Sequence, residues 1–277
     1  MIRIKHIALL AFAAALLLSE TTSFAAKKKW RPKLGLQSWT CRNMTFDQVV
    51  KFAKHHKLKY LQLIGKHINP TAPKAENLAK KKILDENGLV CYTFGVQRTY
   101  DTKEENRQTF EFAKYMGIKL IVVEPRNMAQ WDNLEELVKE YDIKLAIHNH
   151  GHSSVYGTPE KVWNVLKNRD RRIGVCVDIG HISGAGFDVA KAFVDYQGRV
   201  YDFHVKDKKV EKAKNGKNVI LDVEIGTGVA NYKGLFKELA KANFQGVMAI
   251  ETDNRTFAQN PTEFVKEAIQ FVKKSTK

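Results

Sequence analysis

Cysteine is scarce in this sequence. The chain has 277 residues and three cysteines, Cys41, Cys91 and Cys176. None of them belongs to a CxxC pair of the kind found in zinc ribbons, and an odd number implies no disulfide framework. Cys91 and Cys176 fall in apolar runs, where a free thiol behaves as a small buried hydrophobic group. The cysteines therefore give no support to a disulfide-stapled or zinc-ribbon fold.

Two other features are missing. After residue 26 no apolar run is long enough to cross a bilayer as a helix. No GxGxxG follows the first predicted strand, so the main sequence support for a dinucleotide-binding domain is absent. The remaining chain of about 250 residues has the usual size of one (β/α)₈ barrel. No second domain is needed to account for its length.

Acidic residues are outnumbered by basic ones. The chain has 46 Lys and Arg against 30 Asp and Glu, a formal net charge of +16. Such a charge attracts nucleic acid or anionic polysaccharide. However, the lysines lie mainly in predicted helices and are mixed with Glu and Asp, which is typical of a solvated helical surface. We therefore expect no nucleic-acid partner.

The first 26 residues have the composition of a secretory signal peptide. A short basic segment, Met1 to His6, precedes an apolar one, Ile7 to Leu18, and small residues around Ala25 offer a cleavage site. The alternative is an uncut N-terminal membrane anchor, which the short apolar segment disfavours. No cysteine follows that segment, so a lipoprotein anchor is not indicated. We expect residues 1–26 to be removed, leaving a periplasmic or secreted domain, residues 27–277, with no membrane insertion.

Strand-like and helix-like segments alternate along this domain. The predicted strands are Lys33–Trp39, Lys59–Ile64, Leu89–Val96, Ile118–Glu124, Ile143–His150, Ile173–Asp178, Arg199–Lys206 and Val247–Glu251. A helical pattern follows each of them, and eight near-continuous apolar strands predict a parallel sheet covered by helices. Eight βα units favour closure into a TIM barrel, an α/β fold. The segment Asp207 to Ala230 is predicted to be a long irregular loop after the seventh strand.

Four of the apolar runs stop on residues that bind metals. They read KLAIHNHGH, GVCVDIGH, RVYDFHVKD and GVMAIET, and each has His, Asp or Glu at or near its carboxyl end. In a parallel β/α barrel the carboxyl ends of the strands meet on one face, where catalytic groups gather. Imidazole and carboxylate together favour one divalent ion such as Mn²⁺, Mg²⁺, Co²⁺ or Zn²⁺. The pattern therefore predicts a metal site on that face.

These motifs resemble the xylose isomerase-like TIM-barrel superfamily, which includes ketose 3-epimerases, inosose and keto-sugar hydro-lyases, and endonuclease IV. The matching motifs are AIHNHG, CVDIGH, FHVKD and the final AIE. The resemblance implies Asp178, His204 and Glu251 as metal ligands. His148 stands where the epimerases have a glutamate that is both ligand and acid/base residue. A two-glutamate epimerase mechanism therefore does not transfer directly to this chain.

Several other polar residues near the strand ends have more than one interpretation. Glu124 is either a further ligand or base, or an exposed residue before Pro125. His150 could line the pocket, bind the metal, or orient His148. Lys206 could stabilise an enolate with Asp207 as its partner, or form an ordinary ion pair. The remaining candidate substrate-binding residues are His181, Trp39 and Gln62. His181 stands at a position that resembles a substrate-oxygen contact of the family, and Trp39 and Gln62 lie at the ends of early strands.

The resemblance and the ligand set imply an enzyme that enolises a carbohydrate. A metal-bound carbonyl would lose its α-proton to a carboxylate, Glu251 being the first candidate, to form an enediolate. We expect a keto-sugar isomerase or epimerase with an unphosphorylated small-molecule substrate. The first alternative is a hydratase or dehydratase acting on a 3-keto-sugar or its unsaturated derivative. An abasic-site endonuclease is a weaker alternative, because it would need further metal ligands on the early strands. Whether the protein forms homo-oligomers is left open.

Overall fold

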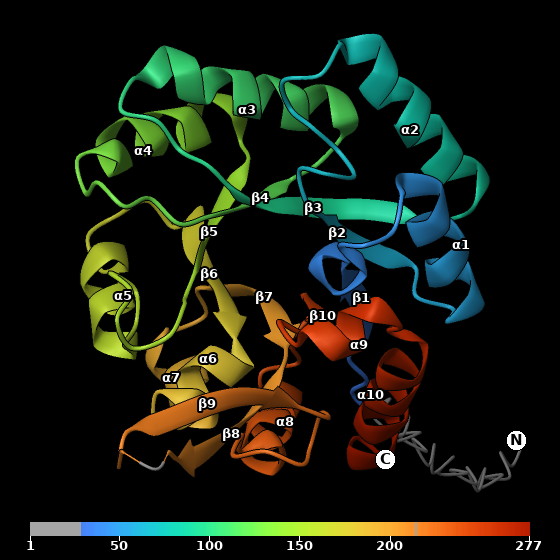
Figure 1. Cartoon of the computed structure of the whole chain (residues 1–277). Coiled ribbons are helices and arrows are strands. Elements are labelled where there is room, and N and C mark those ends of the chain that lie inside the picture. The colour runs from blue at the N-terminus through green and yellow to red at the C-terminus, as the bar shows by residue number, and fades with distance from the viewer. Residues whose placement is uncertain (1–28, 214) are drawn as a thin grey trace, which may run out of the picture.

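Eight parallel strands close into a barrel with helices around it, as Figure 1 shows in a computed structural model. The structure describes residues 29–213 and 215–277, so the predicted signal peptide lies outside the described residues. The order of strands around the barrel is β1-β10-β7-β6-β5-β4-β3-β2. The predicted (β/α)₈ architecture is therefore confirmed.

All eight predicted barrel strands are present, several of them shorter than expected. The barrel strands are β1 (Lys33–Gln37), β2 (Tyr60–Leu63), β3 (Val90–Gln97), β4 (Leu120–Val123), β5 (Lys144–His148), β6 (Ile173–Asp178), β7 (Val200–Val205) and β10 (Val247–Ile250). β4, β6 and β10 are buried over their whole length. Their sequences are continuous apolar runs because helices cover the outer face while side chains fill the inside of the barrel.

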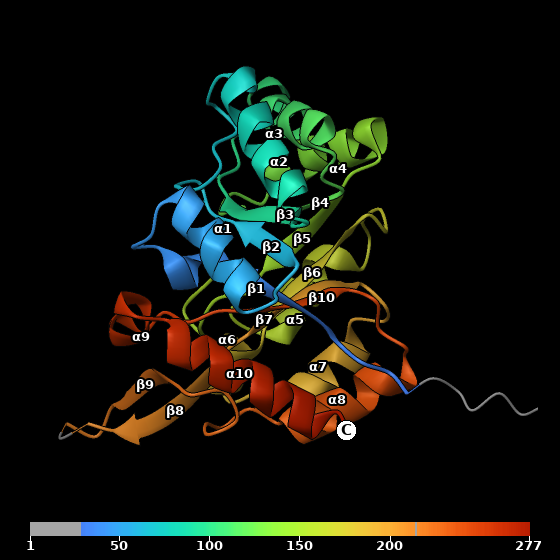
Figure 2. The same ribbon diagram turned by 90° about the vertical axis from the view of Figure 1, so that its right-hand side faces the viewer.

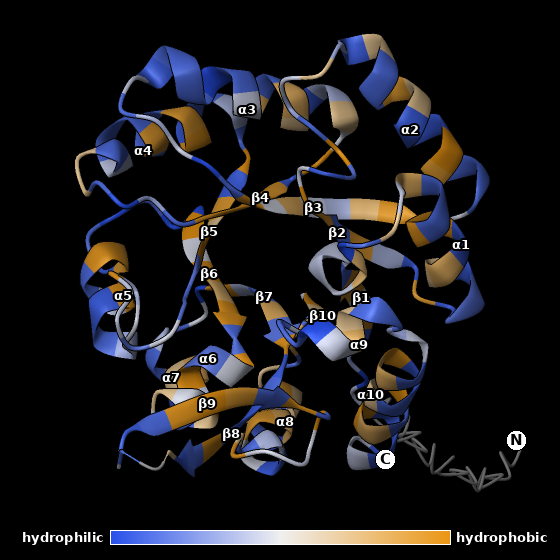
Figure 3. Cartoon of the chain, in the orientation of Figure 1, coloured by the Kyte–Doolittle hydropathy of each residue, from blue (hydrophilic) through white to orange (hydrophobic). Residues whose placement is uncertain are grey.

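A predicted helix follows each strand along the chain. These helices are α1 (Phe46–His55), α2 (Lys74–Glu86), α3 (Lys103–Met116), α4 (Gln130–Tyr141), α5 (Pro159–Leu166), α7 (Val189–Asp195), α8 (Tyr232–Lys241) and α10 (Thr262–Ser275). Local chemistry sets several boundaries: Thr45 and Gln48 form a capping box at α1, and Thr158 caps α5. Hydrophilic and hydrophobic residues mix on these helices, as expected where one side faces the barrel (Figure 3).

Three short helical turns lie at the carboxyl ends of strands. They are the 3₁₀ helix η1 (Ser38–Cys41) after β1, α6 (Ile179–Gly184) after β6 and α9 (Arg255–Gln259) after β10. Each is too short to give a clear amphipathic pattern in the sequence. In the described part of the chain, no helix combines the length and the apolar character that a membrane span requires.

The predicted irregular loop after the seventh strand is instead a β-hairpin, so this prediction was wrong. β8 (Asp207–Lys212) pairs antiparallel with β9 (Asn218–Val223). The turn between them contains Asn215 and Gly216, and Gly216 takes the left-handed conformation (φ 76°) that suits a tight turn. The high lysine content of the hairpin concealed its strand character. Figure 2 shows the hairpin projecting beyond the barrel on the same side as α9.

Candidate active site

Four ligand-type side chains meet at the carboxyl end of the barrel. His148 and Asp178 are the last residues of β5 and β6, His204 is the fifth residue of β7, and Glu251 follows β10. All four are buried, with exposed fractions of 5% or less. The closed barrel is what brings together residues as far apart in the sequence as His148 and Glu251.

The four ligand atoms surround one point. His204 Nδ1 lies 2.6 Å from Glu251 Oε2 and 3.0 Å from His148 Nε2. Asp178 Oδ2 lies 3.6 Å from each of these two imidazole nitrogens. One atom from each residue falls within 4.8 Å of all the others. This spacing suits a shared cation.

The donor set fits a divalent metal ion. Asp178 Oδ2 and Glu251 Oε2 are buried and accept no well-oriented hydrogen bond. The single Lys206 ammonium beside them does not balance two buried carboxylates, so a divalent cation would complete the charge balance. His204 Nε2 lies 2.7 Å from the carbonyl oxygen of Gln62, which is itself fully buried. With Nε2 donating to Gln62, Nδ1 is the ring nitrogen that faces the centre of the group, where it would bind a metal ion. Two carboxylates and two imidazoles form a typical site for Zn²⁺, Mn²⁺ or Co²⁺.

Lys206 lies beside this group as a buried cation. Its Nζ is 3.1 Å from Asp178 Oδ2, 3.4 Å from Glu251 Oε2 and 2.9 Å from Asp253 Oδ2. Burial by itself would lower the pKa of Lys206, but these carboxylates raise it well above its usual range. The ammonium group thus stays charged and supplies positive potential where an oxyanion would form.

Asp207 does not pair with Lys206, so that prediction was wrong. Its carboxylate accepts hydrogen bonds from the backbone N–H groups of Lys208, Gly226, Gly228 and Ala230. Three of these contacts anchor the chain after β9 to the first residue of β8. The glycine amides that could have faced a substrate are therefore used to hold this loop.

Glu124 and His150 form a hydrogen-bonded pair next to the metal-type group. Glu124 Oε2 bonds to His150 Nδ1, and the Ser154 hydroxyl donates to Glu124 Oε1 at 2.9 Å. Burial alone would raise the pKa of Glu124 and lower that of His150, but their mutual contact lowers the first and raises the second. Glu124 and His150 also form a second ligand-type group with His148. A histidine held at Nδ1 by a carboxylate leaves Nε2 free to exchange protons.

A cavity of about 460 Å³ opens above these residues. Its walls include Trp39, His148, His150, Lys206, Glu251 and Asp253. A second cavity of about 500 Å³ shares Val96 with the first and is lined by Glu124, Arg98 and Arg126. The two ligand-type groups therefore face space large enough for a sugar-sized molecule.

The three other predicted substrate-binding residues occupy different positions. Trp39 is 41% exposed at the cavity wall, and its indole N–H donates to Asp253 Oδ1 at 3.1 Å. Gln62 lies beneath His204 and is not part of the cavity wall. His181 donates its backbone N–H to Asp178 Oδ1 at 2.8 Å, and its ring lies 5.0 Å from that of His150. Burial lowers the pKa of His181 to about 3, so its ring is neutral.

Two supporting residues escaped the sequence analysis. Asn149 accepts the backbone N–H of Asp178 at 2.9 Å, which ties the ends of β5 and β6 together. Asp253 connects Lys206 to Trp39. Asn149 lies between two histidines of the HNH motif and could have been suspected, whereas nothing in the local sequence around Asp253 points to its partners.

Comparison with known proteins points to one family. Residues 50–275 match the model of the xylose isomerase-like TIM barrel. The inosose dehydratase of Clostridium perfringens is 25% identical over 88% of this chain and 97% of its own length. A crystal structure of an uncharacterised protein from Parabacteroides distasonis has a TM-score of 0.67 and 28% identity over 87% of this chain and 98% of the other. The IOLI protein, solved with a zinc atom, has a TM-score of 0.65 and 18% identity over 88% and 96% of the two chains.

Proposed function

The chain belongs to the xylose isomerase-like TIM-barrel family, and within it we propose that this protein is a metal-dependent hydro-lyase acting on a keto-sugar or a related cyclic ketone. The single observation that carries this proposal is the Glu124–His150 pair, which lies beside the four-residue ligand group. In that group the residue from β5 is His148, not the glutamate of the ketose epimerases. This pair supplies an acid/base group outside the four-residue ligand group, one that can take the α-proton and protonate the leaving hydroxyl. The similarity to inosose dehydratases over most of the chain supports the same reaction class.

We propose that His148, Asp178, His204 and Glu251 hold one divalent ion. The zinc atom in the IOLI protein, a neighbour in fold, is consistent with zinc as one candidate. When bound, such an ion would polarise a substrate carbonyl and the neighbouring hydroxyl, which acidifies the α-proton. The presence of only nitrogen and oxygen donors leaves Mn²⁺, Co²⁺ and Mg²⁺ as further candidates.

The chain's own residues would carry the proton and balance the charge. His150, held at Nδ1 by Glu124, would take the proton from the α-carbon through Nε2 and return it to the hydroxyl that leaves from the β-carbon. The carbon–oxygen bond breaks as the carbon–carbon double bond forms, and the products are an unsaturated ketone and water. Lys206 would stabilise the negative charge on the enolate oxygen, and Trp39 would offer an apolar face to the sugar ring.

Keto-sugar isomerisation or epimerisation, the reaction first expected from the motifs, is the second candidate. It is favoured by Asp178, His204 and Glu251, the residues that the resemblance to ketose epimerases implies as ligands. An abasic-site endonuclease has less support. Among residues 29–213 and 215–277, no ligand-type group includes a residue of β1, β2 or β3. Export, which the N-terminal sequence predicts, favours an unphosphorylated substrate.

The reaction type can be tested directly. The purified protein, loaded with each candidate metal, is incubated in D₂O with inosose, free ketoses, 3-keto-glycosides and their unsaturated derivatives. A hydro-lyase changes the substrate mass by one water and forms or consumes an enone that absorbs in the ultraviolet. Deuterium incorporation at the α-carbon without a change of one water would indicate an isomerase or epimerase instead. If the metal-loaded protein causes neither change with any of these substrates, both proposals are contradicted.

A further inference from the structure

A basic and apolar surface surrounds the C-terminal half of α10, away from the catalytic cavity. Two grooves meet there at Thr276 and Lys277. The first, of about 680 Å³, lies between α8 and α10, and the second, of about 520 Å³, lies beside the amino ends of β1 and β2. The second groove is therefore at the end of the barrel opposite the catalytic residues. We call the two grooves together the α10 surface.

The α10 surface is rich in cations and has no acidic side chain in its walls. Eight lysine and arginine residues line the two grooves: Lys29, Arg31, Lys57, Lys59, Lys233, Lys237, Lys273 and Lys277. Within residues 29–213 and 215–277, none of the eight has an ion-pair partner. By contrast, lysines on other helices, such as Lys80 and Lys191, pair with acidic residues one turn away. Much of the unbalanced positive charge of the chain is therefore concentrated here.

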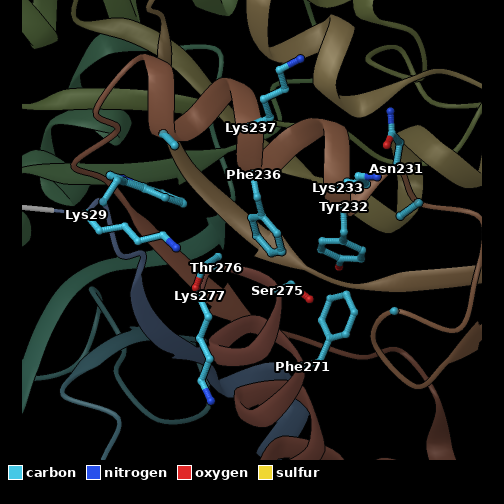
Figure 4. Close-up of a pocket in the computed structure, with 14 residues that line it drawn as sticks. Lys29, Asn231, Tyr232, Lys233, Phe236, Lys237, Phe271, Ser275, Thr276 and Lys277 are labelled. Carbon is cyan, nitrogen blue, oxygen red and sulfur yellow. The ribbon is translucent and has the colours of Figure 1, made fainter.

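The floor of the α10 surface is apolar and aromatic. In the first groove the rings of Tyr232 and Phe236 on α8 face that of Phe271 on α10, with lysines around them (Figure 4). In the second groove Leu34, Leu58 and Tyr60 lie beside Ile269 and Val272. Positive charge alone would suit any polyanion, but apolar grooves between the cations suit an amphiphile. Lipids combine an anionic headgroup with an apolar chain, and aromatic rings favour the boundary between the two.

We propose that the α10 surface binds the surface of a membrane that contains anionic phospholipids. The lysines would contact headgroups, and the two grooves would accept apolar parts of the lipids at the boundary with the acyl chains. Because neither groove shares a lining residue with the catalytic cavity, a bound protein would keep its site open to solvent. Binding of this kind is peripheral and requires no helix that spans the bilayer.

Vesicle co-sedimentation of the full chain tests the proposal. Vesicles with equal parts of phosphatidylglycerol and phosphatidylcholine should bind the protein, vesicles of pure phosphatidylcholine should not, and binding should fall as ionic strength approaches about 1 M. The double variant Lys233→Glu/Lys237→Glu should weaken binding by about 25-fold or more, since each lysine near an anionic surface contributes about fivefold. The matched control Lys114→Glu/Lys167→Glu makes the same charge change on α3 and after α5 and should bind like the parent.

A second pair of variants tests whether the first groove faces the lipids. Ala240 is exposed and lines the first groove. Ala240→Asp places a negative charge against the aromatic floor and should weaken vesicle binding, whereas Ala240→Ser should not. Turnover of a soluble substrate should be unchanged in all these variants, which separates this proposal from the proposed reaction. Absence of binding to anionic vesicles at low salt would overturn the proposal. The proposal would also be overturned if the Lys114→Glu/Lys167→Glu control lost as much vesicle binding, or if the protein bound heparin or DNA but not vesicles.

Discussion

Gln62 provides a sharp test of the metal site, because it contacts a ligand and not the metal. Its carbonyl oxygen accepts the Nε2–H of His204 at 2.7 Å, and both side chains are fully buried. We predict that Gln62→Leu, which keeps the side chain's approximate size but removes the acceptor, lowers metal affinity 10- to 100-fold. That range is typical for loss of a partner that orients a metal-binding histidine, and it corresponds to about 1.4 to 2.8 kcal/mol.

The effect of Gln62→Leu on stability without metal should be smaller. Leaving the His204 N–H unpaired in the interior costs about 1 to 3 kcal/mol. However, Gln62 Nε2 is itself buried without a hydrogen-bond partner, so its removal recovers part of that cost. We therefore expect a loss of about 1 kcal/mol in the free energy of unfolding of the metal-free protein.

The assay is a competitive metal titration with a chelator, accompanied by denaturant unfolding of the metal-free protein. Gln62→Glu is the matched control, because a carboxylate at this position still accepts from Nε2 and should keep or raise the affinity. Metal affinity of Gln62→Leu within twofold of the parent would refute the assignment of His204 Nδ1 as a ligand. An equal loss in Gln62→Glu would show that packing around β2, not the hydrogen bond, was responsible.

Three further predictions concern other contacts. Glu124→Gln should lower kcat about 100-fold or more with unchanged metal content, because His150 loses its anionic partner; steady-state kinetics and elemental analysis check this. Asp207→Asn should lower the free energy of unfolding by about 2 to 3 kcal/mol in a denaturant titration, because an amide cannot accept all the backbone N–H groups that the carboxylate accepts. The loss of stability caused by Glu135→Gln should depend on pH. Burial alone would raise the pKa of Glu135, but contacts with Lys139, the Asp170 N–H and Arg169 lower it. A depressed carboxylate pKa stabilises the fold above the unfolded value and loses that contribution as pH falls. The difference from the parent should therefore be about 1 kcal/mol at pH 7, should begin to shrink as pH falls below about 4.3, the ordinary glutamate value, and should vanish only below the depressed folded pKa, as measured by denaturant unfolding across pH.

The sequence by itself determined the barrel and its metal-type residues. Apolar runs in a parallel β/α barrel must be continuous because both faces are buried, so each strand and the polar residue at its end are visible locally. His148, Asp178, His204 and Glu251 could be chosen in this way, and the structure brings them together. The hairpin β8–β9 was not visible, because β8 and the turn after it carry many lysines in place of a continuous apolar run.

Only the tertiary structure decided which polar groups contact one another. Hydrogen bonds between residues far apart in sequence depend on strand register, barrel closure and side-chain direction, and no local pattern encodes these. Gln62 on β2 meets His204 on β7, Lys206 pairs with Asp253 and not with its neighbour Asp207, and Glu124 holds His150. The identity of the ligands therefore follows from strand-end chemistry, whereas the partners that orient them follow from how the closed barrel brings distant strands into contact.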